Sequence, residues 1–343
     1  MKISHLAGIG IGVIAVAIAI GLINSSIESS TDKIRVAFFP NISHTVPIVG
    51  IENNFFENDL TGDVKIETKM FDSGPQVIES LFAKSIDFAY VGPGPVINGF
   101  LKSDGNDVII LGGAANGGAS FIIQPDSELT SIENFDGKRI AAPQISNTQD
   151  VSLRHYLSSN GLKTVEKGGS VFVLNISNPD IYTLFAKGDI DGAWVAEPWA
   201  TMLVQDLGGK RLFNESQFWP EKQFSSVLLI GRTEFVENNP KIVNEWILSN
   251  EKTVKWINSN SDESKKIYNQ FLQSYMGKTL SEKIVDEAFS NLVITSEPLK
   301  DTVYTFAERA DSLGYLGRSG YQLDGIFYDE LISVTSLELE QNG

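Results

Sequence analysis

The sequence predicts an α/β protein with two lobes, each built on a mainly parallel sheet that helices cover. Two observations predict this class. Short apolar strands alternate with helical segments from Lys33 to about residue 236, and one helix–turn–strand unit occurs twice in that region. The chain has 343 residues, 42% of them hydrophobic and 20% charged. That is enough for two packed domains of roughly 150 residues each.

Apolar runs predict the strands, and proline predicts several helix starts, because the first helical turn needs no N–H partner. The expected strands are 34–39, 64–71, 87–91, 108–111, 120–124, 139–142, 171–175, 193–196 and 226–231. The expected helices begin at Ser43, Pro75, Pro95, Thr148, Pro179 and Pro198. From about residue 237, amphipathic patterns predict helices over 243–257, 262–275, 280–291 and 300–313, almost without strands.

The repeated unit is FAKSIDFAYVGPGP at 82–95 and FAKGDIDGAWVAEPW at 185–199. With one inserted residue, Asp87 aligns with Asp191 and Tyr90 with Trp194. Helix–turn–strand units can look alike by chance, but the shared FAK, Ile-Asp and aromatic-Val steps favour two equivalent halves. We expect both aspartates to accept hydrogen bonds from backbone N–H groups. A ligand is expected between the halves, beyond the carboxyl ends of their strands.

The N-terminus carries an apolar segment. Residues 6–23 are eighteen uncharged residues that follow Lys2 and precede a polar stretch. This layout is typical of a signal peptide, yet the run also has the length of a membrane-spanning helix. No small-x-small cleavage site follows it, which favours an anchor. We therefore expect a signal peptide or membrane anchor over 1–26, a tether over 27–32, and the remaining chain outside the membrane.

Composition and missing motifs exclude several kinds of chemistry. The absence of cysteine excludes disulfides, thiolate catalysis and cysteine-ligated metals, and three histidines are too few for a histidine-rich metal site. A net charge of −16 argues against binding to nucleic acid. The sequence has no P-loop, G-x-S-x-G, H-E-x-x-H or EF-hand pattern. We expect no enzyme activity, no cofactor and no metal.

Four segments are informative together: FFPNISHT (38–45), DSGPQVIESLFAKSIDFAYVGPGPVING (72–99), GKRIAAPQISNTQDVSLRHYL (137–157) and GDIDGAWVAEPWA (188–200). They resemble the solute-binding proteins of ABC importers in the nitrate, sulfonate and taurine branch. Their order and spacing extend the resemblance over nearly all of 33–315. It implies a two-lobed type II periplasmic-binding fold with a hinge, here preceded by the N-terminal apolar helix.

The resemblance also implies a domain division and a set of partners. Lobe 1 would comprise 33–118 plus 225–343 and lobe 2 would comprise 119–224, with strands near 120–124 and 226–231 as the hinge. The protein would be an extracytoplasmic receptor that delivers a small anion or zwitterion to an ABC permease and its ATPase. We expect a monomer, held at the membrane only through its N-terminal helix.

The predicted ligand-binding residues gather at helix starts, where free N–H groups and the helix dipole can hold an oxyanion without a basic side chain. They are Asn41, His44, Ser73, Gly74, Gly92, Gly94, Asn147, Thr148 and Gln149. Each also has a purely structural interpretation. Asn147 is a good N-cap, the glycine–proline sequence is a rigid turn, and a lone histidine is more often structural.

Glu197 and Trp199 complete the candidate site in the second half. Glu197 has two open roles: partner for a ligand ammonium group, as in an aminosulfonate, or structural hydrogen-bond acceptor that closes the hinge. Of Trp194 and Trp199, we expect one in the core and one in the pocket wall.

Two alternatives use the same fold. One is a binding protein for a neutral thiamine-type pyrimidine precursor, and the other is a surface solute sensor. The related pyrimidine synthases carry a cysteine-rich motif, which this chain lacks.

Overall fold

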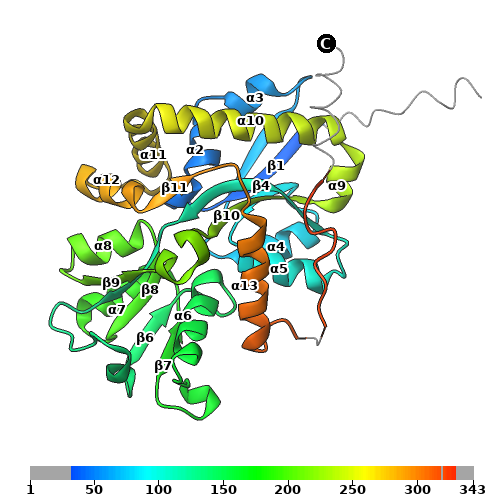
Figure 1. Ribbon diagram of the computed structural model, residues 1–343. Helices are drawn as coiled ribbons and strands as arrows, with labels where there is room; N and C mark the ends of the chain where they lie inside the picture. The colour runs from blue at the N-terminus through cyan, green and yellow to red at the C-terminus, as the bar shows by residue number, and fades with distance from the viewer. Residues whose placement is uncertain (1–31, 318–319, 330–343) are drawn as a thin grey trace, which may run out of the picture. The chain divides into compact units, whose positions relative to one another are not determined.

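The computed structural model describes residues 32–317 and 320–329, whose strands form two sheets (Figure 1). The predicted apolar helix and residues 27–31 of the tether lie outside the described residues. The six-stranded sheet has the order β11–β4–β10–β3–β1–β2. Its strands are β1 (Lys33–Phe38), β2 (Lys65–Met70), β3 (Phe88–Val91), β4 (Val108–Gly117), β10 (Ser225–Arg232) and β11 (Leu292–Ile294).

The five-stranded sheet has the order β7–β6–β8–β5–β9. Its strands are β5 (Ala119–Ile123), β6 (Arg139–Ala142), β7 (Phe172–Asn175), β8 (Gly192–Ala196) and β9 (Lys210–Asn214). The α/β class and the two-sheet architecture predicted from the sequence are thereby confirmed. The prediction of mainly parallel sheets is wrong, because β10 and β5 each enter the middle of a sheet antiparallel to both neighbours.

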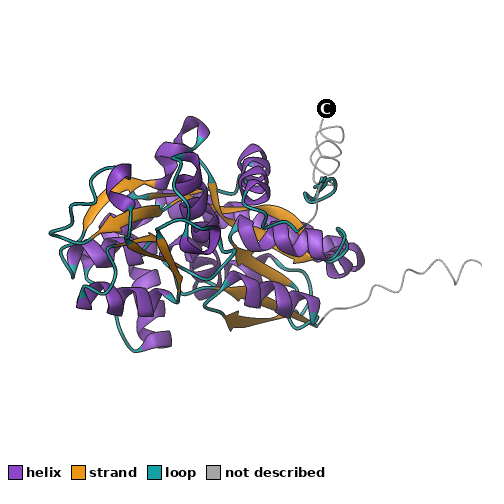
Figure 2. Cartoon of the chain, turned by 90° about the horizontal axis from the view of Figure 1, so that it is seen from below, coloured by secondary structure: helices purple, strands orange, loops and turns teal. Residues whose placement is uncertain are grey.

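Helices lie on both faces of the strands (Figure 2). In the first half these are α2 (Thr45–Glu52), α3 (Phe55–Asp59), α4 (Gly74–Phe82) and α5 (Pro93–Lys102). In the second half they are α6 (Thr148–Ser159), α7 (Asn178–Lys187) and α8 (Trp199–Gln205). The C-terminal part adds α9 (Thr233–Asn238), α10 (Pro240–Ser259), α11 (Ser261–Met276), α12 (Glu282–Ser290) and α13 (Lys300–Ser312).

The two sheets repeat one topology. In the six-stranded sheet, β1 lies parallel to both β2 and β3, and β10 pairs antiparallel with β3 and β4. In the other sheet, β6, β7, β8, β5 and β9 take the same places in the same senses. Even the register agrees, since Val36 pairs with Phe88 and Ile140 pairs with Gly192. The internal repeat is therefore confirmed in the strand pairing.

All nine predicted strands and all six predicted helix starts are present within a residue or two, apart from the length of β4. This strand continues six residues beyond the predicted end at 111, through small residues with low strand propensity. Gly113 explains why they are small: a Cβ there would lie 2.3 Å from the backbone oxygen of Glu297. The sequence analysis missed β9 and β11, which are short strands at the sheet edges.

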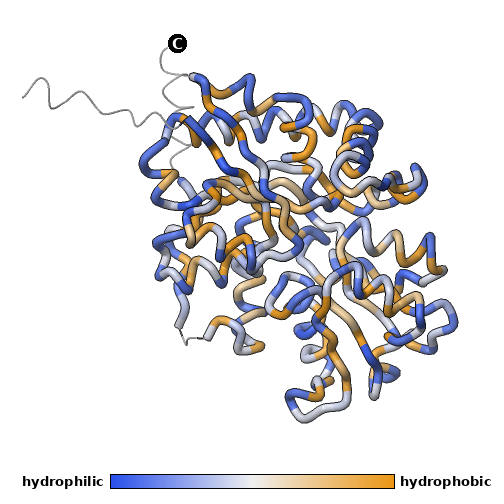
Figure 3. The backbone as a smooth tube through the Cα atoms, turned by 180° about the vertical axis from the view of Figure 1, so that it is seen from behind, coloured by the Kyte–Doolittle hydropathy of each residue, from blue (hydrophilic) through white to orange (hydrophobic). Residues whose placement is uncertain are grey.

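Apolar side chains cover both faces of each sheet, because neighbouring strand residues point to opposite sides. Val36 and Phe38 belong to one buried cluster and Ala37 to another. Figure 3 shows the hydrophobic strands inside the more polar helical surface. Trp194 is buried in the core of the five-stranded sheet, as expected for one of the two tryptophans.

Two chain segments connect the two sheets, and they run next to each other. The first contains Gly117 and Gly118, which both have φ of +75°, a conformation that favours glycine. Gly117 N donates to Phe224 O at 3.1 Å, and Phe224 N donates to Asn116 Oδ1 at 2.9 Å. The strands expected to act as the hinge, β5 and β10, lie inside the sheets next to these crossings. Hinge motion at the crossings and the lobe boundaries remain predictions.

A carboxylate fixes the start of the central strands in each half. Asp87 Oδ2 accepts from Arg35 N at 3.0 Å, and Arg35 O accepts from Asp87 N at 2.8 Å. Asp191 makes the same pair of bonds with Arg139, both at 2.8 Å. The expectation that both aspartates satisfy backbone N–H groups is confirmed.

Candidate functional site

The start of α5 and the start of α6 meet, although the two helices belong to different halves. Gly94 N donates to Thr148 Oγ1 at 3.4 Å. A Cβ on Gly92 would lie 2.5 Å from the same oxygen, and one on Gly94 would lie 3.2 Å from Ser146 O and Thr148 N. Only glycine therefore permits this approach without displacement. The structure brings the predicted residues Gly92, Gly94 and Thr148 together.

The start of α4 packs against the same region. A Cβ on Gly74 would lie 2.2 Å from Pro95 Cγ, so Gly74 serves helix packing here. Its neighbour Ser73 is 1% exposed, and the Ser73 hydroxyl has no hydrogen-bond partner among the described residues. Ser225 at the start of β10 is equally buried, and its hydroxyl also lacks a partner within the described part of the chain. Buried hydroxyls are normally hydrogen-bonded, and neither of these has a partner within residues 32–317 and 320–329.

Asn41 is the N-cap of the short 3-10 helix Ile42–His44 that precedes α2, and His44 is its last residue. Asn41 O accepts from His44 N at 2.9 Å, whereas the Asn41 side chain makes no capping bond. His44 is buried, its ring lies 4.7 Å from that of Phe39, and its Nδ1 accepts from Phe39 N at 3.4 Å. Burial lowers the pKa of His44 to about 3. His44 is therefore neutral and carries its proton on Nε2, so it offers a hydrogen-bond donor but no charge.

The cap of α6 occupies part of the predicted set. Asn147 Oδ1 accepts from Thr148 N at 2.5 Å, which is the capping role, while Gln149 is 9% exposed. Fully buried Asp150 accepts from Ser146 N at 2.9 Å and from Arg154 Nε at 2.7 Å. It also accepts from Asn175 Nδ2 and Tyr315 OH. These four bonds hold the α6 start rigidly.

Glu197 lies at 0% exposure in a network that joins the two halves. Its Oε1 accepts from Arg211 Nη2 at 3.0 Å and from Asn291 Nδ2 at 2.9 Å, and its Oε2 accepts from Thr201 N at 2.9 Å. Arg211 comes from β9, whereas Asn291 follows α12 beside the six-stranded sheet. Burial raises the pKa of Glu197, and the Arg211 charge opposes that rise. Of its two open roles, these contacts favour the structural acceptor.

Trp199 is partly buried against an apolar cluster on one face of the five-stranded sheet, and its ring centroid lies 6.5 Å from that of Tyr182. Its place in a pocket wall remains a prediction. Sequence reasoning missed Arg211, Asn291 and Ser225, because their partners are brought together only by the fold.

The described residues contain no group of three metal-ligating side chains and no helix long and apolar enough to span a membrane.

The fold is that of the periplasmic binding proteins. The alkanesulfonate-binding protein of Xanthomonas axonopodis pv. citri, bound to MOPS, shares the fold with a TM-score of 0.71 at 18% identity. The match covers 87% of this chain and 98% of that one. The nitrate-binding protein of Synechocystis PCC 6803 matches with a TM-score of 0.71 at 17% identity, over 91% of this chain and 90% of that one.

Residues 28–272 match the model of the NMT1-like family, and the chain belongs to that family. A Bacillus subtilis (strain 168) protein, provisionally named an aliphatic sulfonates-binding protein, is 25% identical over 79% of this chain and 76% of its own length. The taurine-binding periplasmic protein of Escherichia coli (strain K12) is 27% identical over 52% of this chain and 53% of its own length.

Proposed function

We propose that this protein is an extracytoplasmic solute-binding protein of an ABC importer, which captures a small oxyanion of the sulfonate, taurine or nitrate type. The single observation that carries the proposal is the meeting of α5 and α6 across the two halves, at Gly94 and Thr148. Relatives named for sulfonate and taurine binding support the ligand class.

The chemistry of the site suits an anion held by N–H and O–H donors. Each helix start carries roughly half a positive charge and unpaired N–H groups. Two arginines of the second half are engaged by carboxylates: Arg154 with Asp150 at 2.7 Å and Arg211 with Glu197 at 3.0 Å. The buried hydroxyls of Ser73 and Ser225, which have no partner among the described residues, would supply further donors. An oxyanion would therefore be bound mainly by dipoles.

Closure would couple binding to transport. An anion that bridges both helix starts binds the closed state better than the open one. Shifting the open and closed populations from 1:99 to 99:1 takes about 5.5 kcal/mol of differential affinity. A few charge-assisted hydrogen bonds, at about 1.5–3 kcal/mol each, supply that amount. The closed form would then dock on the permease and its ATPase.

Calorimetry on the purified full-length chain tests the proposal, with methanesulfonate, taurine, nitrate and a neutral aminopyrimidine as ligands. We expect at least one anion to bind and Gly92→Ala to weaken it by about tenfold or more, because the new Cβ would displace Thr148. Gly112→Ala in β4 is the control, because its new Cβ would meet only Ser296 O, at an ordinary contact distance of 3.5 Å. Binding of the pyrimidine without any anion would instead establish the alternative ligand class.

A further inference from the structure

A pocket of about 220 Å³ lies between α6, α13 and the 3-10 helix Glu215–Phe218 that follows β9. Helix α6 contributes side chains from its second turn to its C-cap, and α13, which packs against α6, contributes Arg309 (Figure 1). Neither Gly94 nor Thr148, where the starts of α5 and α6 meet, lines this pocket. The pocket is therefore separate from the proposed oxyanion site.

Three aromatic rings form the apolar wall of the pocket, those of Tyr156, Trp194 and Phe218. The ring centroid of Tyr156 lies 5.1 Å from that of Phe218 and 5.7 Å from that of Trp194. Phe218 is 40% exposed, which leaves ring surface open to a ligand. An apolar cavity of about 150 Å³ is large enough to hold benzene. The size and the lining of this pocket therefore suit one substituted aromatic ring.

Arg309 is the cation of the lining, and it lies half-buried beside the aromatic wall. Its Nη2 donates to Phe218 O at 2.7 Å, and its Cζ lies 3.7 Å from the centroid of the Trp219 ring. Within the described part of the chain, Arg309 makes this one hydrogen bond and no ion pair. Burial lowers the pKa of Arg309, and the charge of Glu215 opposes that shift. The remaining N–H groups of Arg309 can donate to an anion.

Glu215 is the carboxylate of the lining, and its oxygens are occupied. It is 0% exposed, and its Oε1 accepts from Ser152 Oγ at 2.6 Å and from Trp219 Nε1 at 3.2 Å. Its Oε2 accepts from Trp194 Nε1 at 2.7 Å. Burial raises the pKa of Glu215. Three donors thus surround this carboxylate, and it does not take up the N–H groups of Arg309.

The other polar side chains of the lining carry no charge. Burial and the charge of Arg309 lower the pKa of His155 below its ordinary 6.5, so His155 is neutral at pH 7. His155 Nε2 shares a hydrogen bond with Ser159 Oγ at 3.3 Å, and Asn160 Nδ2 donates to Tyr156 O at 2.8 Å. The pocket therefore combines an aromatic wall with one guanidinium that has N–H groups to spare.

We propose that this pocket is a second ligand site, which binds a small aromatic carboxylate. The ring would lie against Tyr156, Trp194 and Phe218, and the carboxylate would accept hydrogen bonds from Arg309. Benzoate is the simplest ligand of this class. The site does not depend on the proposed function, because it uses no residue at the starts of α5 and α6.

Ligand-observed NMR titrations of the full-length chain with benzoate, benzamide and acetate test the site. We expect benzoate to bind with a dissociation constant of about 1 mM or lower. Benzamide and acetate should bind at least about tenfold more weakly, because benzamide lacks the charge and acetate lacks the ring. This comparison uses the native chain and needs no variant.

Substitutions then test the two parts of the site. Arg309→Gln should weaken benzoate binding about tenfold, and Phe218→Ala should weaken it about fivefold. The matched controls are Arg139→Gln and Phe172→Ala, which remove the same side chains from exposed positions outside the pocket and should leave the affinity within about twofold. Thermal melting followed by circular dichroism establishes that each variant is folded.

Gly92→Ala distinguishes this pocket from the oxyanion site, where benzoate could also bind as an anion. Loss of benzoate binding in Gly92→Ala but not in Arg309→Gln would overturn the second site. Equal affinity for benzoate and benzamide, or no binding of benzoate up to about 10 mM, would overturn it as well. None of these results decides whether sulfonates or nitrate bind. Benzoate binding that Arg309→Gln and Phe218→Ala weaken and Gly92→Ala leaves intact would support the site.

Discussion

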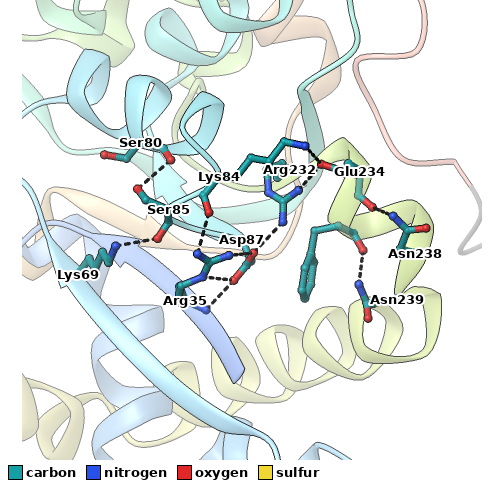
Figure 4. A network of polar contacts seen from close by, with 11 residues as sticks. Arg35, Lys69, Ser80, Lys84, Ser85, Asp87, Arg232, Glu234, Asn238 and Asn239 are labelled. Carbon is teal, nitrogen blue, oxygen red and sulfur yellow. Dashed lines mark hydrogen bonds and ion pairs between the residues drawn. The ribbon is translucent and has the colours of Figure 1, made fainter. Parts of the chain in front are cut away.

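Asp87 and Asp191 occupy the same place in the two halves, yet their surroundings differ. Each accepts a backbone N–H from an arginine 52 residues earlier. Asp87 has a side-chain exposure of 1%, and its Oδ1 accepts from Arg35 Nη2 at 2.7 Å and from Arg232 Nη2 at 3.0 Å (Figure 4). Asp191 is 32% exposed, and its nearest cation is Lys138 Nζ at 3.4 Å.

The difference shows that the two copies of the motif share their backbone hydrogen bonds but not their side-chain contacts. The backbone bonds are set by strand pairing and are equal in both halves. The side-chain network depends on burial and on β10, which carries Arg232 into the six-stranded sheet beside β3. One carboxylate therefore ties three strands of one sheet together, whereas its counterpart joins only β6 and β8.

The largest expected effect sharpens this contrast. Asp87→Asn should lower the free energy of unfolding by about 3 kcal/mol, because it leaves two guanidinium groups without their shared carboxylate. Asp191→Asn should lower the free energy of unfolding by about 1 kcal/mol, because that carboxylate is partly hydrated. Urea unfolding followed by circular dichroism measures both. Equal losses would show that burial does not distinguish the two positions.

The histidines of the two halves should differ in their response to pH. Buried His44 has a folded-state pKa of about 3, below its ordinary 6.5, so the unfolded chain binds a proton that the folded chain excludes. The free energy of unfolding should therefore fall by about 2 kcal/mol between pH 7 and pH 5 because of this one group. His155 on α6 is half-buried, and burial lowers its pKa to a lesser extent.

Denaturant titrations at pH 7 and pH 5 of the native chain, His44→Gln and His155→Gln measure this difference. His44→Gln should remove most of the pH-dependent loss, and His155→Gln should remove less. A pH profile unchanged by His44→Gln would contradict a neutral, buried His44.

The smallest expected effect concerns Glu197, whose counterpart in the repeat is Pro93. Glu197→Gln should weaken the binding of taurine and of ethanesulfonate by factors that agree within about twofold, because Glu197 is occupied by Arg211 and Asn291. Calorimetry with the two ligands measures the ratio. A much larger loss for taurine would establish the ammonium role of this carboxylate.

The sequence predicted much of this fold because its local signals agree with the final structure. Apolar runs and early prolines placed nine strands and six helix starts, and the repeat predicted the shared topology. The edge strands β9 and β11 escaped detection because they are short, and β9 (KRLFN) shows no alternation of polar and apolar residues. The last six residues of β4 were not predicted as strand because they are small. At Gly113 a small residue is needed, since the backbone of Glu297 packs directly against it.

The candidate site was predictable only in part. Helix-start chemistry pointed to Gly92, Gly94 and Thr148, which the structure brings together. The partners of Glu197 were not predictable, since Asn291 lies 94 residues away in sequence.

The strand order has a consequence for how the chain is made. All five strands of the smaller sheet come from residues 119–214, whereas the larger sheet must wait for β10 at 225–232, which lies between β3 and β4. On the ribosome, which releases the N-terminus first, the middle of the protein can thus mature before the beginning does. Until β10 is synthesised, β3 and β4 each have an unpaired edge. A chaperone that binds nascent chains would bind at these edges.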